Sequence, residues 1–270
     1  MTREQLVAEI RKKKSMLCVG LDTDLEKIPP HLLELEDPIF EFNKAIIDAT
    51  APFAVAYKPN MAFFEAYGVK GWLSMQKTFD YLNASYPEIF TVADAKRGDI
   101  GNTSTRYAKA FFEELGADSL TIAPYMGADS VKPFLEFEGK FAIVLGLTSN
   151  AGAQDFQLQP HKDGYLFEEI LRTVSSWGSP DKLMFVVGAT KTDYLKKVRA
   201  IIPDHFLLVP GVGAQGGSLE EVLEFGLGKE PNLLINSSRG VIYSSKSDDF
   251  SDAAAASASD LQRKMKPFIT

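Results

Sequence analysis

The sequence contains a single cysteine, Cys18, among its 270 residues. One cysteine excludes an internal disulfide and is typical of a chain that folds in a reducing compartment. No base or metal ligand stands at a recognisable spacing from Cys18, so we expect it to be a small buried apolar side chain. Histidine is also scarce: the only three are His31, His161 and His205, and none pairs with another at a ligand spacing. We therefore expect structural or solvent-exposed roles for them and no metal site.

The sequence also lacks long apolar segments and an excess of basic charge. No apolar run approaches the roughly 18 residues that a membrane span requires. Residues 2–14 carry Leu6, Val7 and Ile10 at helical spacing, which indicates an amphipathic helix and not a signal peptide. The formal net charge of −7 argues against a general nucleic-acid binder, which would show a basic face. These absences predict a cytoplasmic protein that binds neither membranes nor nucleic acids.

Apolar, β-branched segments alternate with helical patterns along the whole chain. Strands are predicted at 16–21, 53–58, 89–95, 119–123, 141–147, 183–188, 206–209 and 233–236. Helices are predicted at 38–49, 69–86, 103–115, 130–137, 165–177, 192–200, 218–225 and 252–266. Such strand–helix pairs over about 250 residues match a barrel better than an open sheet. We therefore predict an α/β fold, a single (β/α)₈ TIM barrel domain over 1–270 with an additional N-terminal helix.

Charged residues end several of the predicted strands. Asp22 follows the first strand, Lys58 ends the second, and Asp94 and Lys96 end the third. In a (β/α)₈ barrel these ends and the following loops form the active-site face. The four side chains would converge at one barrel mouth with alternating sign, and charge networks in a cleft indicate function more often than isolated pairs do. For the segment 94–99 alone, an exposed ion-pair cluster worth about 0–1 kcal/mol is the alternative.

The glycine-rich segment 211–217 follows the seventh predicted strand. Its letters fit G-x-G-x-x-G, but a dinucleotide fingerprint belongs to the first strand–helix unit of an open sheet. Barrel loops after strands seven and eight often hold a phosphate. The backbone of Gly213, the amide of Gln215 and the guanidinium of Arg239, which follows Ser238, suit such an anion. A simple turn with a surface arginine is the alternative.

The segment 149–161 after the fifth predicted strand is long for a connection between a strand and a helix. It is polar and contains glycine. A loop of this kind at the barrel mouth suggests a lid over a bound ligand. Its first residue, Ser149, lies two residues after the end of that strand.

The segment Asp-Ala-Lys-Arg-Gly-Asp-Ile-Gly-Asn-Thr at 94–103 resembles the signature of the orotidine 5′-phosphate decarboxylase family, in its longer bacterial subfamily. The resemblance extends through 21–22, Lys58, 147–150, 210–217 and 238–239. It implies conversion of orotidine 5′-phosphate to uridine 5′-phosphate and carbon dioxide, the last step of de novo UMP (pyrimidine) synthesis. It also implies that no cofactor or metal takes part, and that two copies form a homodimer with shared active sites.

The same resemblance assigns roles to individual residues. It makes Lys96 the proton donor to C6 of the pyrimidine and places Asp94 against the departing carboxylate; Asp99 and Lys58 complete the implied catalytic group. The implied substrate-binding residues are Asp22, Lys58, Ile100, Thr103, Ser149, Gln215 and Arg239, with the phosphate at Gly213, Gln215, Ser238 and Arg239. Among them, Asp99, Ile100 and Thr103 resemble the part that one subunit donates to its neighbour's site.

Two other functions stay open at this point. The first is a Mg²⁺-dependent sugar-phosphate decarboxylase or aldolase on the same scaffold, although that branch carries a carboxylate where Lys58 stands. A cation at this position would repel the metal ion. The second is a non-enzymatic barrel that binds a phosphate ligand, which would leave the Asp94, Lys96 and Asp99 motif unexplained.

Overall fold

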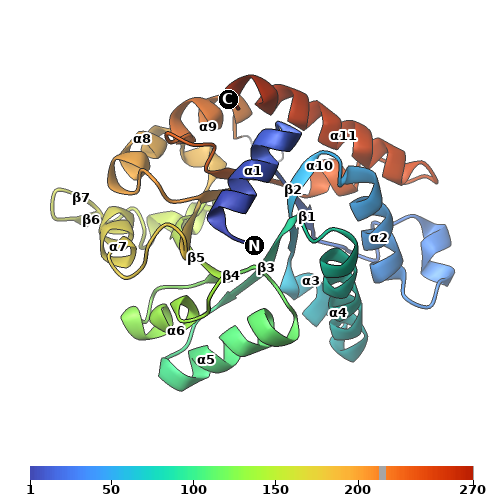
Figure 1. The fold of residues 1–270 in the computed structure, drawn as a ribbon, viewed down its shortest axis with the longest axis horizontal. Helices are drawn as coiled ribbons and strands as arrows, with labels where there is room; N and C mark the ends of the chain where they lie inside the picture. Colours follow the sequence, from blue (N-terminus) through green and yellow to red (C-terminus); the bar gives the residue numbers. More distant parts are fainter. Residues whose placement is uncertain (213–216, 270) are drawn as a thin grey trace.

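The computed structural model describes residues 1–212 and 217–269, and eight parallel strands within them close into a barrel (Figure 1). The barrel strands are β1 (Leu17–Leu21), β2 (Ala54–Pro59), β3 (Phe90–Arg97), β4 (Ser119–Ile122), β5 (Phe141–Leu147), β8 (Leu183–Val187), β9 (Leu207–Pro210) and β10 (Leu233–Ser237). Their order around the barrel is β1-β10-β9-β8-β5-β4-β3-β2, and each neighbouring pair is parallel. Each strand lies within two residues of its predicted range, so the predicted (β/α)₈ barrel is confirmed.

Helices pack around the outside of the barrel and alternate with its strands (Figure 1). The longer ones are α2 (Pro38–Thr50), α4 (Gly68–Ser85), α5 (Gly101–Lys109), α7 (Leu166–Ser175), α8 (Thr192–Ile201), α9 (Leu219–Gly226) and α11 (Phe250–Met265). Local sequence explains their starts. At α2, the Asp37 side chain accepts a hydrogen bond from the Phe40 N–H at 3.1 Å, and Pro38 occupies the first helical position, where no N–H is needed.

The predicted helix at 130–137 is wrong in extent. A 3₁₀ turn, η3 (Ala128–Ser130), comes first, and the α-helix α6 spans only Lys132–Leu135. Pro133 explains the difference, because a helix that began at 130 would need the backbone N–H that proline lacks. The predicted helix at 103–115 likewise divides into α5 and a π-helical turn, η2 (Ala110–Glu114).

Several short elements escaped the sequence analysis because they are too short to show a hydrophobic period. They are η1 (Pro30–Glu34), α3 (Met61–Glu65), η4 (Ala151–Gln154), β6 (Pro160–His161), β7 (Gly164–Tyr165), η5 (Ala189–Lys191), α10 (Arg239–Ile242) and η6 (Lys266–Phe268). Of these, α3 and α10 directly follow barrel strands β2 and β10, so they lie at the end of the barrel that carries the predicted site.

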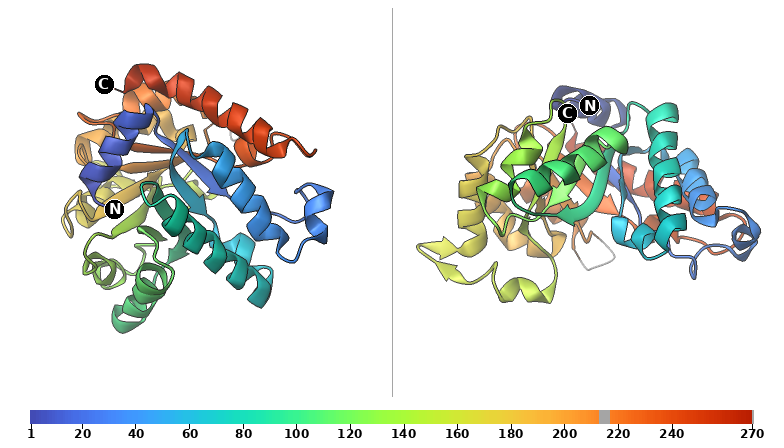
Figure 2. Two further views of the ribbon diagram at one scale, coloured as in Figure 1. Left: turned by 45° about the vertical axis from the view of Figure 1, so that its right-hand side comes forward. Right: turned by 90° about the horizontal axis from the view of Figure 1, so that it is seen from below.

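The predicted N-terminal helix is present as α1 (Arg3–Lys13), and its side chains Leu6, Val7 and Ile10 are buried. Arg3 forms an ion pair with Glu230 at 2.8 Å and donates to the Asp204 carbonyl at 3.1 Å. Both partners precede a barrel strand, so α1 covers the amino-terminal end of the barrel, opposite the strand ends that carry the predicted site (Figures 1 and 2).

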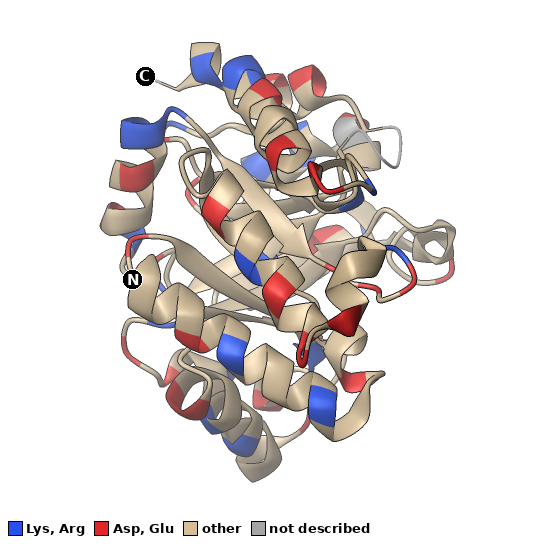
Figure 3. Ribbon diagram, turned by 90° about the vertical axis from the view of Figure 1, so that its right-hand side faces the viewer, with Lys and Arg blue, Asp and Glu red and all other residues tan. Residues whose placement is uncertain are grey.

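The barrel strands are buried and mostly apolar, as their sequence predicts. Cys18 lies in β1 and is fully buried as a free thiol, and burial raises its pKa to about 12. It therefore serves packing, as expected. In the described parts of the chain, none of the helices is both long and apolar enough to span a membrane. Acidic and basic residues are interspersed along the outer helices in the view of Figure 3.

Candidate active site

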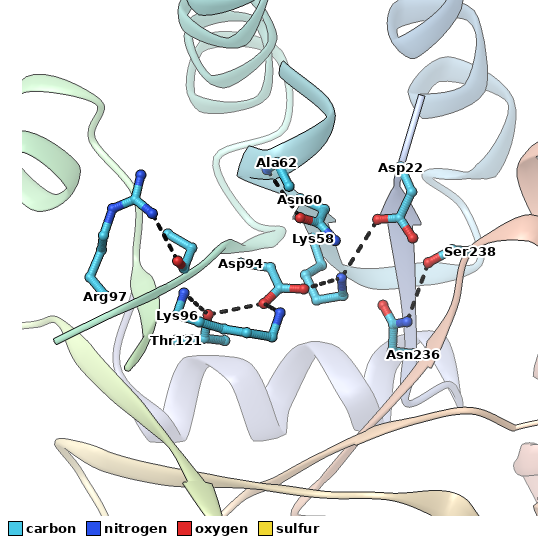
Figure 4. A network of polar contacts seen from close by, with 11 residues as sticks. Asp22, Lys58, Asn60, Ala62, Asp94, Lys96, Arg97, Thr121, Asn236 and Ser238 are labelled. Carbon is cyan, nitrogen blue, oxygen red and sulfur yellow. Dashed lines mark hydrogen bonds and ion pairs between the residues drawn. The ribbon is translucent and has the colours of Figure 1, made fainter. Parts of the chain in front are cut away.

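Four charged side chains from three neighbouring strands form one chain of contacts at the carboxyl ends of the strands (Figure 4). The Lys58 ammonium lies 2.8 Å from Asp94 Oδ2 and 3.8 Å from Asp22 Oδ1. The other carboxylate oxygen of Asp94 accepts a hydrogen bond from Lys96 Nζ at 2.7 Å. The structure thus brings together the four charges that the strand ends predicted, with their signs alternating.

These charges differ strongly in their exposure to solvent. The side chains of Lys58 and Asp94 are only 5% and 10% exposed, whereas that of Lys96 is 51% exposed. Burial alone would lower the pKa of Lys58, but the carboxylates of Asp94 and Asp22 outweigh burial and raise it above its usual range. Burial alone would raise the pKa of Asp94, but the ammonium groups of Lys58 and Lys96 hold it well below its usual range. Lys58 and Asp94 are therefore both charged at neutral pH.

The backbone at Lys96 departs from that of a regular strand. Strand β3 runs to Arg97, and its register against β4 shifts between Ala93 and Arg97. Within this shift Lys96 has a φ of 49°, in the left-handed region that non-glycine residues seldom occupy. The contact between Asp94 and Lys96 therefore depends on an irregular backbone and not on simple alternation along a strand.

Two adjoining cavities open beside these four charged side chains. One has a volume of about 180 Å³ and is lined by Asp22, Lys58, Asn60, Asp94, Pro210, Gly211, Val212, Asn236, Ser237, Ser238 and Arg239. The other has a volume of about 240 Å³ and is lined by Lys58, Asp94, Lys96, Leu145, Thr148, Ser149, Asn150, Val186, Leu208 and Pro210. They share Lys58, Asp94 and Pro210. The first cavity is mostly polar and its lining includes Arg239, whereas the second has aliphatic walls. Together the two cavities suit a ligand with one anionic end and one flat, less polar end.

Ser149 lines the second cavity, as its place after β5 predicts. The segment that follows is a folded unit and not an open loop: it contains η4, and β6 pairs with β7 in a short hairpin. Gln157 ties this unit to the barrel, because its side-chain oxygen accepts from the Thr148 N–H at 2.7 Å and its amide donates to Thr148 Oγ1 at 2.8 Å. The lid role of this segment stays a prediction.

The first cavity is lined in part by Ser238 and Arg239, the residues expected to bind an anion, and Arg239 begins α10. Ser238 packs so closely against β1 that a Cβ at Gly20 would lie 1.8 Å from its hydroxyl oxygen, so this position requires glycine. Arg239 is exposed, and its guanidinium has no ion pair within residues 1–212 and 217–269. The predicted phosphate ligands Gly213 and Gln215 lie outside the described residues.

Neither of the two cavities is lined by Asp99, Ile100 or Thr103 of the same chain. The Asp99 carboxylate accepts a hydrogen bond from the Ile100 N–H at 2.7 Å, and no contact joins it to Lys96 in the described part of the chain. The side chains of Ile100 and Thr103 are exposed at the start of α5. A single chain therefore does not bring these three residues to the charged cluster.

The structure also adds residues to the site that the sequence analysis missed. Asn60 lines the first cavity, pairs with Asp94 across the strand ends and caps α3 by accepting from the Ala62 N–H at 3.2 Å. Asn236 is 8% exposed, and its Oδ1 has no hydrogen-bond partner among the described residues. Asn60 stands two residues after Lys58 and Asn236 near the end of β10, so the strand-end rule could have found both.

Among the described residues, no three His, Cys, Asp or Glu side chains are grouped so that they could hold a metal ion. At the mouth itself, the Lys58 ammonium occupies the space between Asp22 and Asp94 where a cation would have to bind.

Comparison with solved structures places the fold among known enzymes. The structure of Leishmania donovani OMP decarboxylase superimposes with a TM-score of 0.83 at 36% sequence identity, over 99% of this chain and 98% of that protein. The structure of Leishmania donovani UMP synthase gives a TM-score of 0.85 at 36% identity, but the match covers only 56% of that longer chain.

Comparison of sequences gives the same family. The orotidine 5′-phosphate decarboxylase of Flavobacterium johnsoniae is 60% identical over 269 residues, which cover 100% of this chain and 98% of that one. Residues 15–254 match the sequence profile of the family described as orotidine 5′-phosphate decarboxylase / HUMPS. A match over most of the chain, together with relatives of nearly equal length, shows that this protein belongs to the orotidine 5′-phosphate decarboxylase / HUMPS family.

Proposed function

We propose that this protein converts orotidine 5′-phosphate (OMP) to uridine 5′-phosphate (UMP) and carbon dioxide, the last step of de novo UMP synthesis. The observation that carries the proposal is the alternating chain Asp22–Lys58–Asp94–Lys96 at the barrel mouth. It ends in a half-exposed ammonium beside a cavity, which is the arrangement needed to meet negative charge on a bound ligand. The relatives of similar length carry the name of this activity.

The chemistry explains why a lysine stands at position 96. The bond between C6 of the pyrimidine and its carboxylate breaks, carbon dioxide leaves, and the electron pair stays on C6. Lys96 Nζ then transfers a proton to C6, which gives UMP, and the neutral amine regains a proton from water. An ammonium held in place opposes the carbanion as it forms, so it stabilises the transition state more than the substrate.

The size of this effect follows from Coulomb's law. At about 4 Å and an effective dielectric constant near 20, one ammonium stabilises a unit negative charge by about 4 kcal/mol. That corresponds to roughly a thousandfold in rate, which is useful but cannot by itself account for so difficult a decarboxylation. We propose that binding of the phosphate and ribose supplies the remainder by orienting the substrate and closing the mouth.

The two cavities suggest how the substrate lies. The phosphate would bind at Ser238 and Arg239 together with Gly213 and Gln215, and the pyrimidine would enter the second cavity near Ser149. The ribose would then span the shared wall, where Asp22 and Lys58 are within reach of its hydroxyl groups. In this pose Asp94 faces the carboxylate that leaves.

We also propose that two copies form a homodimer in which Asp99, Ile100 and Thr103 enter the neighbour's site. Two features of the single chain support this. These residues are turned away from their own cleft, and beside them an apolar groove of about 450 Å³ runs between α4 and α5–η2, lined in part by the exposed Val69, Trp72 and Leu73. An exposed apolar surface of this kind is typical of a protein interface.

The test is to follow the absorbance of OMP with the purified protein, with and without EDTA. We expect turnover that resists the chelator, and a Lys96→Ala variant that still binds UMP but has lost turnover. Loss of wild-type activity in EDTA would favour the Mg²⁺-dependent branch of the superfamily instead. A protein that binds the nucleotide and never consumes it would support a non-enzymatic binding barrel. A cytoplasmic location stays a prediction from the sequence.

A further inference from the structure

We propose that Thr121, in β4, is a positioning residue for Lys96: its hydroxyl group holds both the backbone and the carboxylate partner of that lysine. The inference rests on the proposed function, because it assumes that the Lys96 ammonium must point at the reacting carbon. Thr121 is 1% exposed and does not line either cavity, so it would act through Lys96 and not on the substrate.

The register between β3 and β4 shows why this position is special. Ala93 pairs with Leu120 and Arg97 pairs with Ile122, so Asp94, Ala95 and Lys96 lie opposite Thr121 alone. Strand β3 therefore bulges away from a regular ladder at the residues that carry the chemistry. In such a bulge the extra residues lose their ladder hydrogen bonds, and a side chain has to replace them.

The Thr121 hydroxyl does so twice (Figure 4). It accepts a hydrogen bond from the Lys96 N–H at 3.0 Å and donates one to Asp94 Oδ1 at 3.0 Å. That same Asp94 oxygen accepts from Lys96 Nζ at 2.7 Å. The Thr121 hydroxyl thus holds Lys96 at both ends. It bonds directly to the Lys96 backbone N–H, where φ is 49°, and it bonds to the Asp94 oxygen that accepts from the Lys96 ammonium.

Threonine suits this position for a physical reason. Its branched Cβ restricts χ1, so the hydroxyl is held in one direction between the two strands. Valine has nearly the same shape but neither donates nor accepts, so Thr121→Val would remove both hydrogen bonds with little change in packing volume. Lys96 would then lose the contact that favours its left-handed backbone, and its ammonium would be held less firmly over the cavity.

The experiment compares steady-state kinetics of Thr121→Val and Thr121→Ser on OMP with binding of UMP. We expect Thr121→Val to lower kcat by about 10- to 100-fold, equivalent to about 1.4–2.7 kcal/mol. KM and the Kd for UMP should change by less than about threefold, because Thr121 touches no part of the ligand. Thr121→Ser keeps the hydroxyl and should retain kcat within about threefold of wild type. If Thr121→Val does not fold, Thr121→Ala is measured against the same expectations.

Ser119 offers a matched control on the same strand. Its hydroxyl is fully buried and donates across the same strand pair to the Thr91 carbonyl at 3.0 Å, away from Lys96. Ser119→Ala should lower stability while leaving kcat unchanged. An equal fall of kcat in Ser119→Ala and Thr121→Val would overturn the inference, since it would indicate general loosening of the sheet.

The outcomes also separate this inference from the proposed function. Wild-type kcat in Thr121→Val, with an active wild type and an inactive Lys96→Ala, would refute the positioning role alone. Full turnover by Lys96→Ala, or no turnover by the wild type, would refute the proposed function itself. A fall of kcat in Thr121→Ser as large as in Thr121→Val would show that the hydroxyl is not the group that matters.

Discussion

Replacement of Lys58 by methionine removes the central charge of the site while keeping a side chain of similar length. Its ammonium lies 2.8 Å from Asp94 and 3.8 Å from Asp22. At an effective dielectric constant of about 20, these two attractions amount to about 6 and about 4 kcal/mol, opposed by the cost of burying the charges. Removal of one member of a buried ion pair typically costs about 3–5 kcal/mol. We expect Lys58→Met to lower the free energy of unfolding at pH 7 by that amount.

The loss of unfolding free energy in Lys58→Met should become smaller as the pH falls. In the wild type the pKa of Asp94 is lowered on folding, so its contribution to stability is present above the unfolded pKa of about 4 and is lost as pH falls below it. Without Lys58, burial is opposed only by Lys96 and the Thr121 hydroxyl, so the pKa of Asp94 rises and the carboxyl protonates more readily. The difference in unfolding free energy between wild type and Lys58→Met should therefore narrow as pH falls from 7 toward 4.

Urea denaturation at several pH values measures both effects. Lys13→Met is the control: this partly buried lysine donates to two neutral carbonyl groups, of Ala51 at 3.0 Å and Ala54 at 2.8 Å. Its loss should cost about 1 kcal/mol and breaks no ion pair among the described residues, so no buried carboxylate loses its partner. A Lys58→Met protein that loses less than about 1 kcal/mol at pH 7, or whose deficit widens in acid, would refute the electrostatic account of the site.

Three further predictions concern acid stability, the phosphate and the dimer. Burial lowers the pKa of His205 to about 4. The contribution of neutral His205 to stability is therefore complete above about pH 6.5 and is lost as pH falls toward 4. A His205→Phe variant should show a flatter dependence of unfolding free energy on pH between about 6.5 and 4, and an unchanged slope would contradict this. Arg239→Met should raise KM for OMP by about 10- to 100-fold with little effect on the phosphate-free nucleoside orotidine, whereas equal effects on both substrates would argue against phosphate binding. Mixing inactive Lys96→Ala and Asp99→Asn proteins should restore up to about a quarter of wild-type activity, because half of the dimers are mixed and each of these holds one intact site; no recovery after exchange of subunits would argue against shared sites.

Much of the site could be predicted from strand ends alone. A strand of a parallel barrel shows as an apolar segment, and its carboxyl end faces the mouth wherever the strand lies in the sequence. Asp22, Lys58 and Asp94 end or follow such segments, so their convergence follows from the fold class. The motif at 94–103 then identifies the family without any coordinates.

Features that depend on contacts between strands could not be predicted in this way. The shift of register opposite Thr121, the left-handed backbone of Lys96 and the β6–β7 hairpin each depend on which residues lie across from one another. A bulge leaves no period in the sequence, and a two-residue strand is shorter than the pattern that would reveal it. The short α6 was mispredicted because Pro133, and not hydrophobic spacing, sets where that helix begins.

By itself, the sequence determined the barrel, the end of the barrel that carries the candidate site and the charged residues that meet there, because these follow from hydrophobic period and strand order. Only the tertiary structure decided how the charges are joined: Lys58 lies between two carboxylates, and Lys96 contacts Asp94 both directly and through the Thr121 hydroxyl. The physical reason is that hydrogen bonds and ion pairs act over about 3–4 Å. At that range one residue of register decides which groups meet, and the one-dimensional pattern of a strand contains no information about the register of its neighbour.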